Sequence, residues 1–397
     1  MVVRLTAQRR LLPGALALCA LLGPGATIAA TTPADATNSP GRDFFVSPAG
    51  SDANEGTSTS APWRTLARVD SARPLPGDRV HLLGGARFNE PLAPFAGTSG
   101  TSTAPITFDS YGSGRATLAG GIYLNSVSNL VFDNLDVTST QKGVFSSASG
   151  SGVCAVKLSN MTISNVPLAG VSSNNRSDCN WIIDGVTIRH TGDSGIYFLG
   201  SNFTISHSHI VETGTNASIG YPRHGIYASG PAPTILYNVI ERSSTSGISL
   251  RYQDSIVKGN RIAGGVRGIS FEQQAAVAGR TRIVSNTISD VSDSGIVVAR
   301  PAIESFVVAN NTIANAGTYG MYFHAVGNLT IANNIVASDG TNASLLNVRK
   351  PTGSYGEHDN RWNGGSRTPF YWNGVGRDFN TYRVASGQGR GDRFGYP

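Results

Sequence analysis

One short phrase recurs through the middle of this chain. Each copy contains a Gly-Ile or similar step in a strand-forming run, a second strand-forming run, and a residue, often Asn, two places before an Ile or Val. Successive copies are 22 to 30 residues apart, which leaves room for three short strands and no helix. Such a repeat is typical of a β-solenoid, in which each coil buries its apolar face only against its neighbours. The residues that align the copies are Leu135, Met161, Val186, Ser208, Asn238, Asn260, Asn286, Asn311 and Asn334.

The Gly-Ile strands have two distinguishable faces, since neighbouring side chains on a strand point to opposite sides. One apolar row runs from Ile196 to Met321, and a second row, two residues further along each coil, runs from Phe198 to Phe323. Both rows are predicted to point inward, and nothing in them suggests a cofactor. The asparagines form a column at one corner, where stacked amides can bond to one another and to the turn backbone. We interpret that column as structural.

The N-terminus has the pattern of a secretory signal peptide over residues 1–30, with three arginines before the apolar run Leu11–Leu22 and small residues after it. That run is too short for a transmembrane helix. Residues 31–42 are polar and aperiodic, and we expect a disordered leader there. Residues 43–397 are expected to form a single domain, with regular coils from about 130 to 335. The chain is therefore predicted to be secreted, with no membrane attachment after cleavage.

The charge of the chain restricts its partners. Lys and Arg number 31 against 25 acidic residues, a net charge of +6, and removal of the three signal-peptide arginines lowers it to +3. This modest basic balance fits an acidic polysaccharide, and no run of Lys or Arg indicates nucleic acid.

Two cysteines remain after the signal peptide, Cys154 and Cys179, each seven residues before the aligned position of its coil. They should lie on adjacent coils, with Cα atoms about 4.8 Å apart. That spacing is within disulfide range, and a secreted protein meets oxidising conditions. The sequence leaves two alternatives open, a disulfide or two stacked buried thiols.

The ends of the stack need covers, because exposed strand edges recruit other chains. Phe44–Gly56 reads as a strand closed by a turn, and Pro62–Val69 has the apolar spacing of one short capping helix. Pro76–Gly85 and Ala104–Gly112 are predicted to belong to the first coils. Residues 345–397, rich in aromatic residues, Gly and Arg, are expected to cover the last coil irregularly.

The asparagine column, the run Gly247–Gln273 and the opening Phe44–Leu66 resemble the pectate-lyase-like superfamily of right-handed parallel β-helix proteins. The resemblance extends over essentially all of the mature chain. It implies an all-β, right-handed parallel β-helix with a short N-terminal capping helix. It does not fix the reaction, because the superfamily includes lyases, hydrolases, epimerases, fructan-transferring enzymes and phage adhesins. In its enzymes, the active site typically lies on the outward face of one sheet. The Gly-Ile strands of this chain resemble the strands of that sheet.

The outward positions of these strands carry functional side chain types mainly in the middle coils. The longest step, 30 residues, contains the loop Glu212–Tyr227, and extra loop length on a solenoid commonly lies on the binding side. We predict that His224, Tyr227 and Arg251 are catalytic. The predicted substrate-binding residues are Tyr197, Tyr221, Arg223, Arg267, Glu272 and Tyr322.

These residue types suit β-elimination from a uronate polymer, which needs a base for the C5 proton, a cation at the carboxylate and an acid for the leaving oxygen. His224 is the candidate base, Tyr227 the acid or alternate base, and Arg251 the carboxylate clamp. The run Leu250–Gln253 resembles an LRH-type phrase of alginate and chondroitin lyases, which implies that Arg251 corresponds to their catalytic Arg. Their accompanying Lys, one coil earlier, has no counterpart in His224–Ser229.

The leading prediction is thus a secreted, monomeric polysaccharide lyase that acts on an acidic glycan. Calcium is possible, but a calcium site needs several oxygen ligands, and only Glu272 is expected on this face, with Asp193 and Asp293 far apart along the stack. No metal site is therefore assigned.

Two other classes of function stay open. A glycoside hydrolase or glycosyl-transferring enzyme would pair Glu272 with another carboxylate. A non-catalytic carbohydrate-binding protein of the cell surface would bind glycan without turnover. Arg251 and Glu272 also occupy the same outward position on adjacent coils, so an ordinary surface ion pair explains them equally well.

Overall fold

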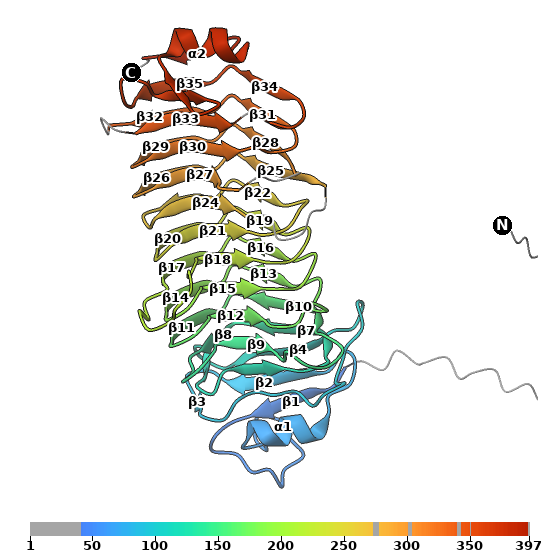
Figure 1. Cartoon of the computed structure of the whole chain (residues 1–397). Coiled ribbons are helices and arrows are strands. Elements are labelled where there is room, and N and C mark those ends of the chain that lie inside the picture. The colour runs from blue at the N-terminus through green and yellow to red at the C-terminus, as the bar shows by residue number, and fades with distance from the viewer. Residues whose placement is uncertain (1–40, 273–277, 301–303, 340–342, 350, 396–397) are drawn as a thin grey trace, which may run out of the picture. The chain divides into compact units, whose positions relative to one another are not determined.

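The computed structural model describes residues 41–272, 278–300, 304–339, 343–349 and 351–395. These residues wind into stacked coils whose strands form three sheets, named A, B and C below (Figure 1). Within the described residues, strands of successive coils pair in parallel, and the pair β36–β37 is antiparallel. The predicted all-β, parallel coil architecture is confirmed.

Each sheet takes one strand from nearly every coil. Sheet A contains β1 (Asp43–Val46), β2 (Arg79–Leu83), β4 (Ile106–Tyr111), β7 (Ser128–Asp133), β10 (Cys154–Ser159), β13 (Ile182–Asp184), β16 (Thr204–Ser206), β19 (Thr234–Leu236), β22 (Ile256–Lys258), β25 (Arg280–Val284), β28 (Ser305–Ala309), β31 (Leu329–Ala332) and β34 (Tyr355–His358). Sheet B contains β3 (Arg87–Phe88), β5 (Ala116–Leu118), β8 (Leu135–Val137), β11 (Thr162–Val166), β14 (Thr187–Thr191), β17 (His209–Thr213), β20 (Val239–Ser243), β23 (Arg261–Ala263), β26 (Thr287–Val291), β29 (Thr312–Ala316), β32 (Ile335–Ser338), β35 (Arg361–Gly364) and β38 (Arg393–Phe394).

Sheet C is formed by the predicted Gly-Ile strands and by their neighbours at both ends of the stack. It contains β6 (Ile122–Leu124), β9 (Val144–Ser146), β12 (Val171–Ser173), β15 (Ile196–Phe198), β18 (Ile226–Ala228), β21 (Ser246–Leu250), β24 (Arg267–Phe271), β27 (Ser294–Val298), β30 (Tyr319–His324), β33 (Ser344–Arg349), β36 (Phe370–Trp372) and β37 (Val375–Arg377).

The core is a set of apolar rows that run through all coils. The predicted inward rows are confirmed, since Ile196, Ile226 and Ile248 are fully buried, as are Phe198 and its stacked counterparts. Burial of each such side chain stabilises the fold by about 1.5–3 kcal/mol. The glycine before the inward Ile has a steric reason, illustrated by the coil of β18. A Cβ on Gly225 would lie 2.6 Å from the Ile240 side chain and 2.6 Å from the next coil's backbone.

The asparagine column is also confirmed. Each buried amide oxygen accepts from the backbone N–H and side-chain amide of the preceding member, as Asn260 does from Asn238 at 3.0 and 2.9 Å. The amide nitrogen also donates to a carbonyl of the coil before, such as Ile205. The ladder extends past the predicted end, through Asn360 to Asp392.

The N-terminal end is covered by α1 (Leu66–Ala72), so the predicted capping helix exists but its bounds were wrong. The helix starts at Leu66 because the Thr65 side chain caps it by accepting from the Arg68 N–H at 3.1 Å. Trp63, expected inside the helix, is instead extended and forms a parallel bridge with Val46, with its indole N–H bonded to the Asn54 carbonyl.

The C-terminal region is more regular than predicted. Strands β33 to β36 continue all three sheets, because residues 344–349 and 351–372 keep the inward apolar positions, including the fully buried Leu346 and Phe370. The cover begins later, at α2 (Phe379–Ser386), which Asp378 caps at its N-terminus. The buried Tyr382 packs this helix against Phe370, with ring centroids 5.2 Å apart.

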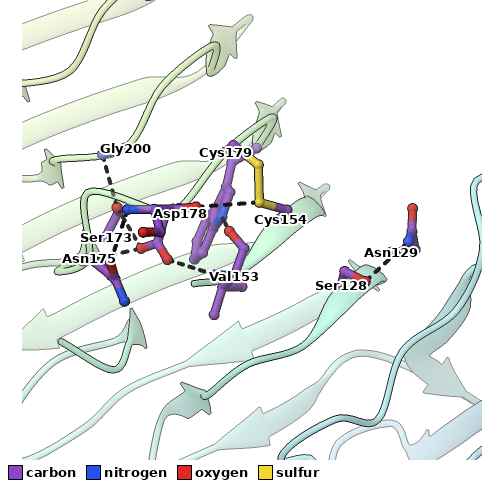
Figure 2. The surroundings of a disulfide bond; sticks show 11 residues. Ser128, Asn129, Val153, Cys154, Ser173, Asn175, Asp178, Cys179 and Gly200 are labelled. Atoms are coloured by element: carbon purple, nitrogen blue, oxygen red, sulfur yellow. Dashed lines mark hydrogen bonds between the residues drawn. A yellow bond between two sulfur atoms is a disulfide. The ribbon is translucent and has the colours of Figure 1, made fainter. Parts of the chain in front are cut away.

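Cys154 and Cys179 form a disulfide between adjacent coils, with Cα atoms 4.5 Å apart (Figure 2). Beside it, the buried Asp178 accepts from the Val153 N–H and the Ser173 hydroxyl, at 2.8 and 2.7 Å. The disulfide and this carboxylate together fix the turn that leads from sheet C back to sheet A.

In the part of the chain that the structure describes, neither helix has the length and apolar character needed to cross a membrane.

Candidate active site

A cavity of about 470 Å³ opens on the outward face of sheet C, over the coils from β9 to β21. It lies at the middle coils, as the sequence predicted. Five of the predicted site residues line it, namely Tyr197, Tyr221, His224, Tyr227 and Arg251.

The long loop between β17 and β18 forms one wall of the cavity. It folds back over the coil of β14, where the N–H groups of Thr215 and Asn216 donate to the carbonyls of Thr191 and Gly192, both at 3.1 Å. This places Pro222 and its neighbours at the cavity edge. The extra residues of the longest repeat step therefore build the wall, as loop length predicted.

Tyr221, on this loop, is held by Asp193. Its hydroxyl donates to the Asp193 carboxylate at 2.7 Å, and the other carboxylate oxygen accepts from the Ser194 N–H at 2.6 Å. Burial and the bonded carboxylate raise the pKa of Tyr221 to about 12, so the phenol stays protonated. Asp193 thus faces the cavity, so the expectation that Glu272 would be the only carboxylate on this face was wrong. The loop that reaches back one coil could not be read from the register.

An aromatic stack on the strands of sheet C forms another part of the lining. Tyr197 and Tyr227 occupy equivalent positions on β15 and β18, and their rings lie parallel with centroids 5.0 Å apart. The Arg251 guanidinium lies 5.2 Å from the Tyr227 ring, and its Nε donates to the Tyr227 hydroxyl oxygen at 3.4 Å. The stack presents phenol groups and one cation to the cavity.

His224 lies flat beside this stack, 5.5 Å from the Tyr227 ring. It is 3% exposed, and burial, with the positive charges of Arg251 and Arg267, lowers its pKa to about 3. Its Nδ1 accepts from the Ser246 N–H at 3.3 Å, which places the proton of the neutral ring on Nε2. So low a pKa makes His224 a weak base, and the geometry suits it better to supporting Tyr227 than to taking the substrate proton.

Lys142 enters the cavity from the other end. Its Nζ donates to the Asn174 side chain at 2.9 Å and to the Ser172 hydroxyl at 3.4 Å. Burial lowers the pKa of Lys142, and the nearby Asp193 carboxylate opposes that shift. A cation therefore stands at each end of the cavity, Lys142 before β9 and Arg251 after β21.

Lys142 was missed, although a sequence signal for it exists. It lies two residues before Val144, as His224 lies two residues before Ile226, and paired strands place these two positions in one row of sheet C. Following that row from His224 over three coils towards the N-terminus would have found Lys142. Arg251 follows β21, and Lys142 precedes β9, which lies four strands away in sheet C. The lyase resemblance implies a Lys only one coil before Arg251.

Four predicted binding residues lie outside the cavity lining. Glu272 bridges two arginines, with 3.0 Å to Arg251 Nη1 and 3.9 Å to Arg267 Nη1. Arg267 also donates to Asp293 at 2.9 Å, so these side chains form a charged row along sheet C. The remaining two are Arg223, which donates to the Asn216 carbonyl within its own loop, and Tyr322, on the more distant β30.

Carboxylates and metal ligands are sparse at this site. Among the described residues lining the cavity, Asp193 is the only carboxylate. Across the described parts of the chain, no group of three or more His, Cys, Asp or Glu side chains could hold a metal ion. Glu272 and Asp293 share Arg267 as a partner and are charge-compensated there.

Comparison with known proteins identifies the family of this fold. A family model described as "right handed beta helix region" matches residues 142–300 and 215–354, which together exceed half of the chain. The chain belongs to the right-handed β-helix family. The handedness implied by the sequence resemblance agrees with this membership.

Relatives within this fold differ in their reactions. A lacto-N-biosidase of Bifidobacterium longum is 27% identical over 213 residues, which cover 41% of this chain and 13% of that protein. A GH136 lacto-N-biosidase structure from Eubacterium ramulus is 13% identical, with a TM-score of 0.50, covering 90% of this chain and 68% of that one. A mannuronic acid specific family 6 lyase from human gut microbiota is 15% identical, with a TM-score of 0.56, covering 87% and 94%. The structural likenesses show the fold alone, and this chain spans a small part of the curated relative.

Proposed function

We propose that this protein is a secreted enzyme that cleaves an acidic polysaccharide by β-elimination in the sheet C cavity. The observation that carries the proposal is the composition of that cavity. Cations stand at both ends, phenols line the walls, and Asp193 is the one carboxylate among the described lining residues. Cations and phenols suit a uronate chain, whereas glycoside hydrolysis commonly needs two carboxylates flanking the bond.

Tyr227 is assigned the proton transfer. In the reaction the deprotonated oxygen of Tyr227 takes the C5 proton of the uronate, the bond from C4 to the leaving oxygen breaks, and a C4–C5 double bond forms. The proton then passes to the leaving oxygen. Arg251, which donates to the Tyr227 oxygen at 3.4 Å, stabilises negative charge on that oxygen when the proton is lost. His224, neutral and stacked on the ring, is a positioning residue.

Lys142 is assigned to carboxylate binding. Because Lys142 stands at the opposite end of the cavity from Tyr227 and Arg251, it is assigned to the carboxylate of a neighbouring uronate in the bound chain. The Lys142 ammonium is oriented by Asn174 and Ser172 towards the same cavity. Tyr221, fixed by Asp193, offers a further hydrogen-bonding group at the loop wall.

The test is incubation of the purified protein with alginate, polygalacturonate, glycosaminoglycans and neutral glycans. Two signals are followed in parallel, the ultraviolet absorbance of the new unsaturated uronate and the number of reducing ends. Elimination predicts that both rise together on at least one acidic polymer. Reducing ends without absorbance would contradict it.

A glycoside hydrolase is the second candidate, and the local 27% identity to a lacto-N-biosidase favours it. In that case Asp193 would be one of the two carboxylates, since Glu272 is already paired with Arg251 and Arg267. The same assay separates the candidates, because hydrolysis of a neutral glycan gives reducing ends and no unsaturated product.

A further inference from the structure

A second polar and aromatic surface lies further along the outward face of sheet C. We name it the distal platform and define it by Tyr319, Tyr322, His324, Asn347 and Arg349. Tyr319, Tyr322 and His324 belong to β30, and Asn347 and Arg349 belong to the adjacent β33. Paired residues place Tyr322 next to Asn347, and His324 next to Arg349.

The rings of the platform form one run along β30. Tyr319 and Tyr322 are stacked with centroids 5.1 Å apart, and Tyr322 and His324 are near parallel at 6.4 Å. All three side chains are partly exposed. Burial, the neighbouring Tyr322 and the nearby Asp293 raise the pKa of Tyr319, so its hydroxyl is a neutral donor at ordinary pH. The apolar C–H face of a sugar packs well on such rings, and phenol groups bond to its hydroxyls.

Polar atoms within the platform lack partners. Asn347 is 8% exposed, and its amide oxygen has no hydrogen-bond partner among the described residues. Arg349 Nη1 lies 3.1 Å from His324 Nε2, which must therefore accept, and the ring proton is on Nδ1. That Nδ1 also has no partner in the described part of the chain. Leaving such groups unpaired costs about 1–3 kcal/mol each, and a hydroxyl-rich ligand would satisfy both.

The platform and the cavity share one face of one sheet. Strands β18 and β30 are four strands apart in sheet C, about 19 Å at the usual spacing. The charged row of Arg251, Glu272 and Arg267 lies between them. A polymer laid along the solenoid axis would cross both surfaces, which a small molecule could not do.

We propose that the distal platform is a second glycan-binding site, which holds a remote segment of the same acidic polysaccharide that the cavity cleaves. The identity of this ligand rests on the proposed function. Arg349, an exposed cation bonded to His324, supplies the charge complement to a uronate carboxylate. The platform therefore raises affinity for long chains and has little influence on short oligosaccharides bound in the cavity alone.

The test measures binding and cleavage separately. Affinity electrophoresis in gels containing alginate or polygalacturonate compares the wild-type protein with Tyr322→Ala, with Arg349→Gln and with the control Tyr237→Ala. Tyr237 is an exposed tyrosine at a corner between sheets A and B. We expect the two platform variants to bind the polymer about fivefold more weakly, and the control to bind as the wild type does. Thermal unfolding of each variant verifies that it is folded.

The outcomes distinguish the two proposals. Polymer binding that depends on Tyr322 and Arg349 supports the platform even when no cleavage is found, and then the proposed function alone fails. A rise in KM for long chains, with KM for a trisaccharide unchanged, supports both. Equal retardation of all variants, or no retardation of the wild type in either gel, overturns the platform.

Discussion

The asparagine corner and the outward face of sheet C are built on the same repeat and use it in opposite ways. At the corner, coil after coil has the same residue, and each buried amide bonds to the next, as Asn286 does to Asn311. On sheet C, the residue at equivalent positions varies along the stack, as Lys142, Ala169, Ser194 and His224 do in one row. Where the repeat is uniform, polar groups satisfy one another. Where it varies, polar groups face a cavity.

This difference explains how a solenoid separates stability from activity. The corner residues are fully bonded within the protein and have no capacity left for a ligand. The cavity residues form hydrogen bonds or ring contacts with the protein, and they also face the cavity, where a ligand can reach them. Substitutions at the corner should therefore change stability, and substitutions in the cavity should change turnover.

The largest effect is expected for Asn286→Ala. The substitution leaves several buried groups unpaired, including the Asn260 N–H and the Val257 carbonyl. We expect the free energy of unfolding to fall by about 3–5 kcal/mol, measured by urea denaturation. The exposed Asn363 of sheet B is the matched control, and its substitution by Ala should have little effect. Equal losses for both variants would show that the column has no special role.

The disulfide gives the next largest effect, because it ties two coils of the stack across a separation of 25 residues. Replacing both Cys154 and Cys179 by Ser should lower the free energy of unfolding by about 3 kcal/mol. The wild-type protein under reducing conditions should match the variant in denaturant unfolding. A variant as stable as the oxidised wild type would contradict this role.

Lys142→Met tests the cavity end that sequence reasoning missed. The substitution keeps the length of the side chain and removes its charge, so kcat/KM for an acidic polymer should fall about 100-fold, equivalent to about 2.7 kcal/mol. Unfolding should change little, since Lys142 is only partly buried. Lys258→Met, on sheet A, is the control. Unchanged turnover in Lys142→Met would remove this lysine from the site.

His224→Gln should change the pH dependence of stability. The pKa of His224 is lowered to about 3 in the folded protein, so the unfolded chain binds the proton first as the pH falls below 6.5. Stability is therefore present above pH 6.5 and lost as the pH falls towards 3. Between pH 7 and pH 5 the wild type should lose about 2 kcal/mol more than the variant. Parallel unfolding curves at both pH values would show that His224 ionises normally.

Much of the fold could be predicted from the sequence, because the repeat sets the register of every coil. Inward rows, the asparagine column and the spacing of the two cysteines all follow from that register. The bounds of α1 could not, since they depend on the Thr65 cap and on the bridge that Trp63 makes. The continuation of the sheets in β33 to β36 was missed because these strands lack the Gly-Ile phrase.

The candidate site was predicted only in part. Residues fixed by the register, such as Tyr197 and Tyr227, were placed in the right row. The contact of Tyr221 with Asp193 depends on how a loop folds back, which no periodicity describes. Arg267 lies outside the cavity lining, and its ion pair with Asp293 could not be foreseen from the residue type alone.

The turnover of Tyr227→Phe is the most direct test of whether the sheet C cavity carries out the cleavage. This variant removes one hydroxyl and keeps the ring that stacks on Tyr197. Turnover per folded molecule is measured on the acidic polymer that gives unsaturated product, with Tyr237→Phe beside it. We predict a loss of at least about 100-fold in Tyr227→Phe alone. Wild-type turnover in Tyr227→Phe would contradict it.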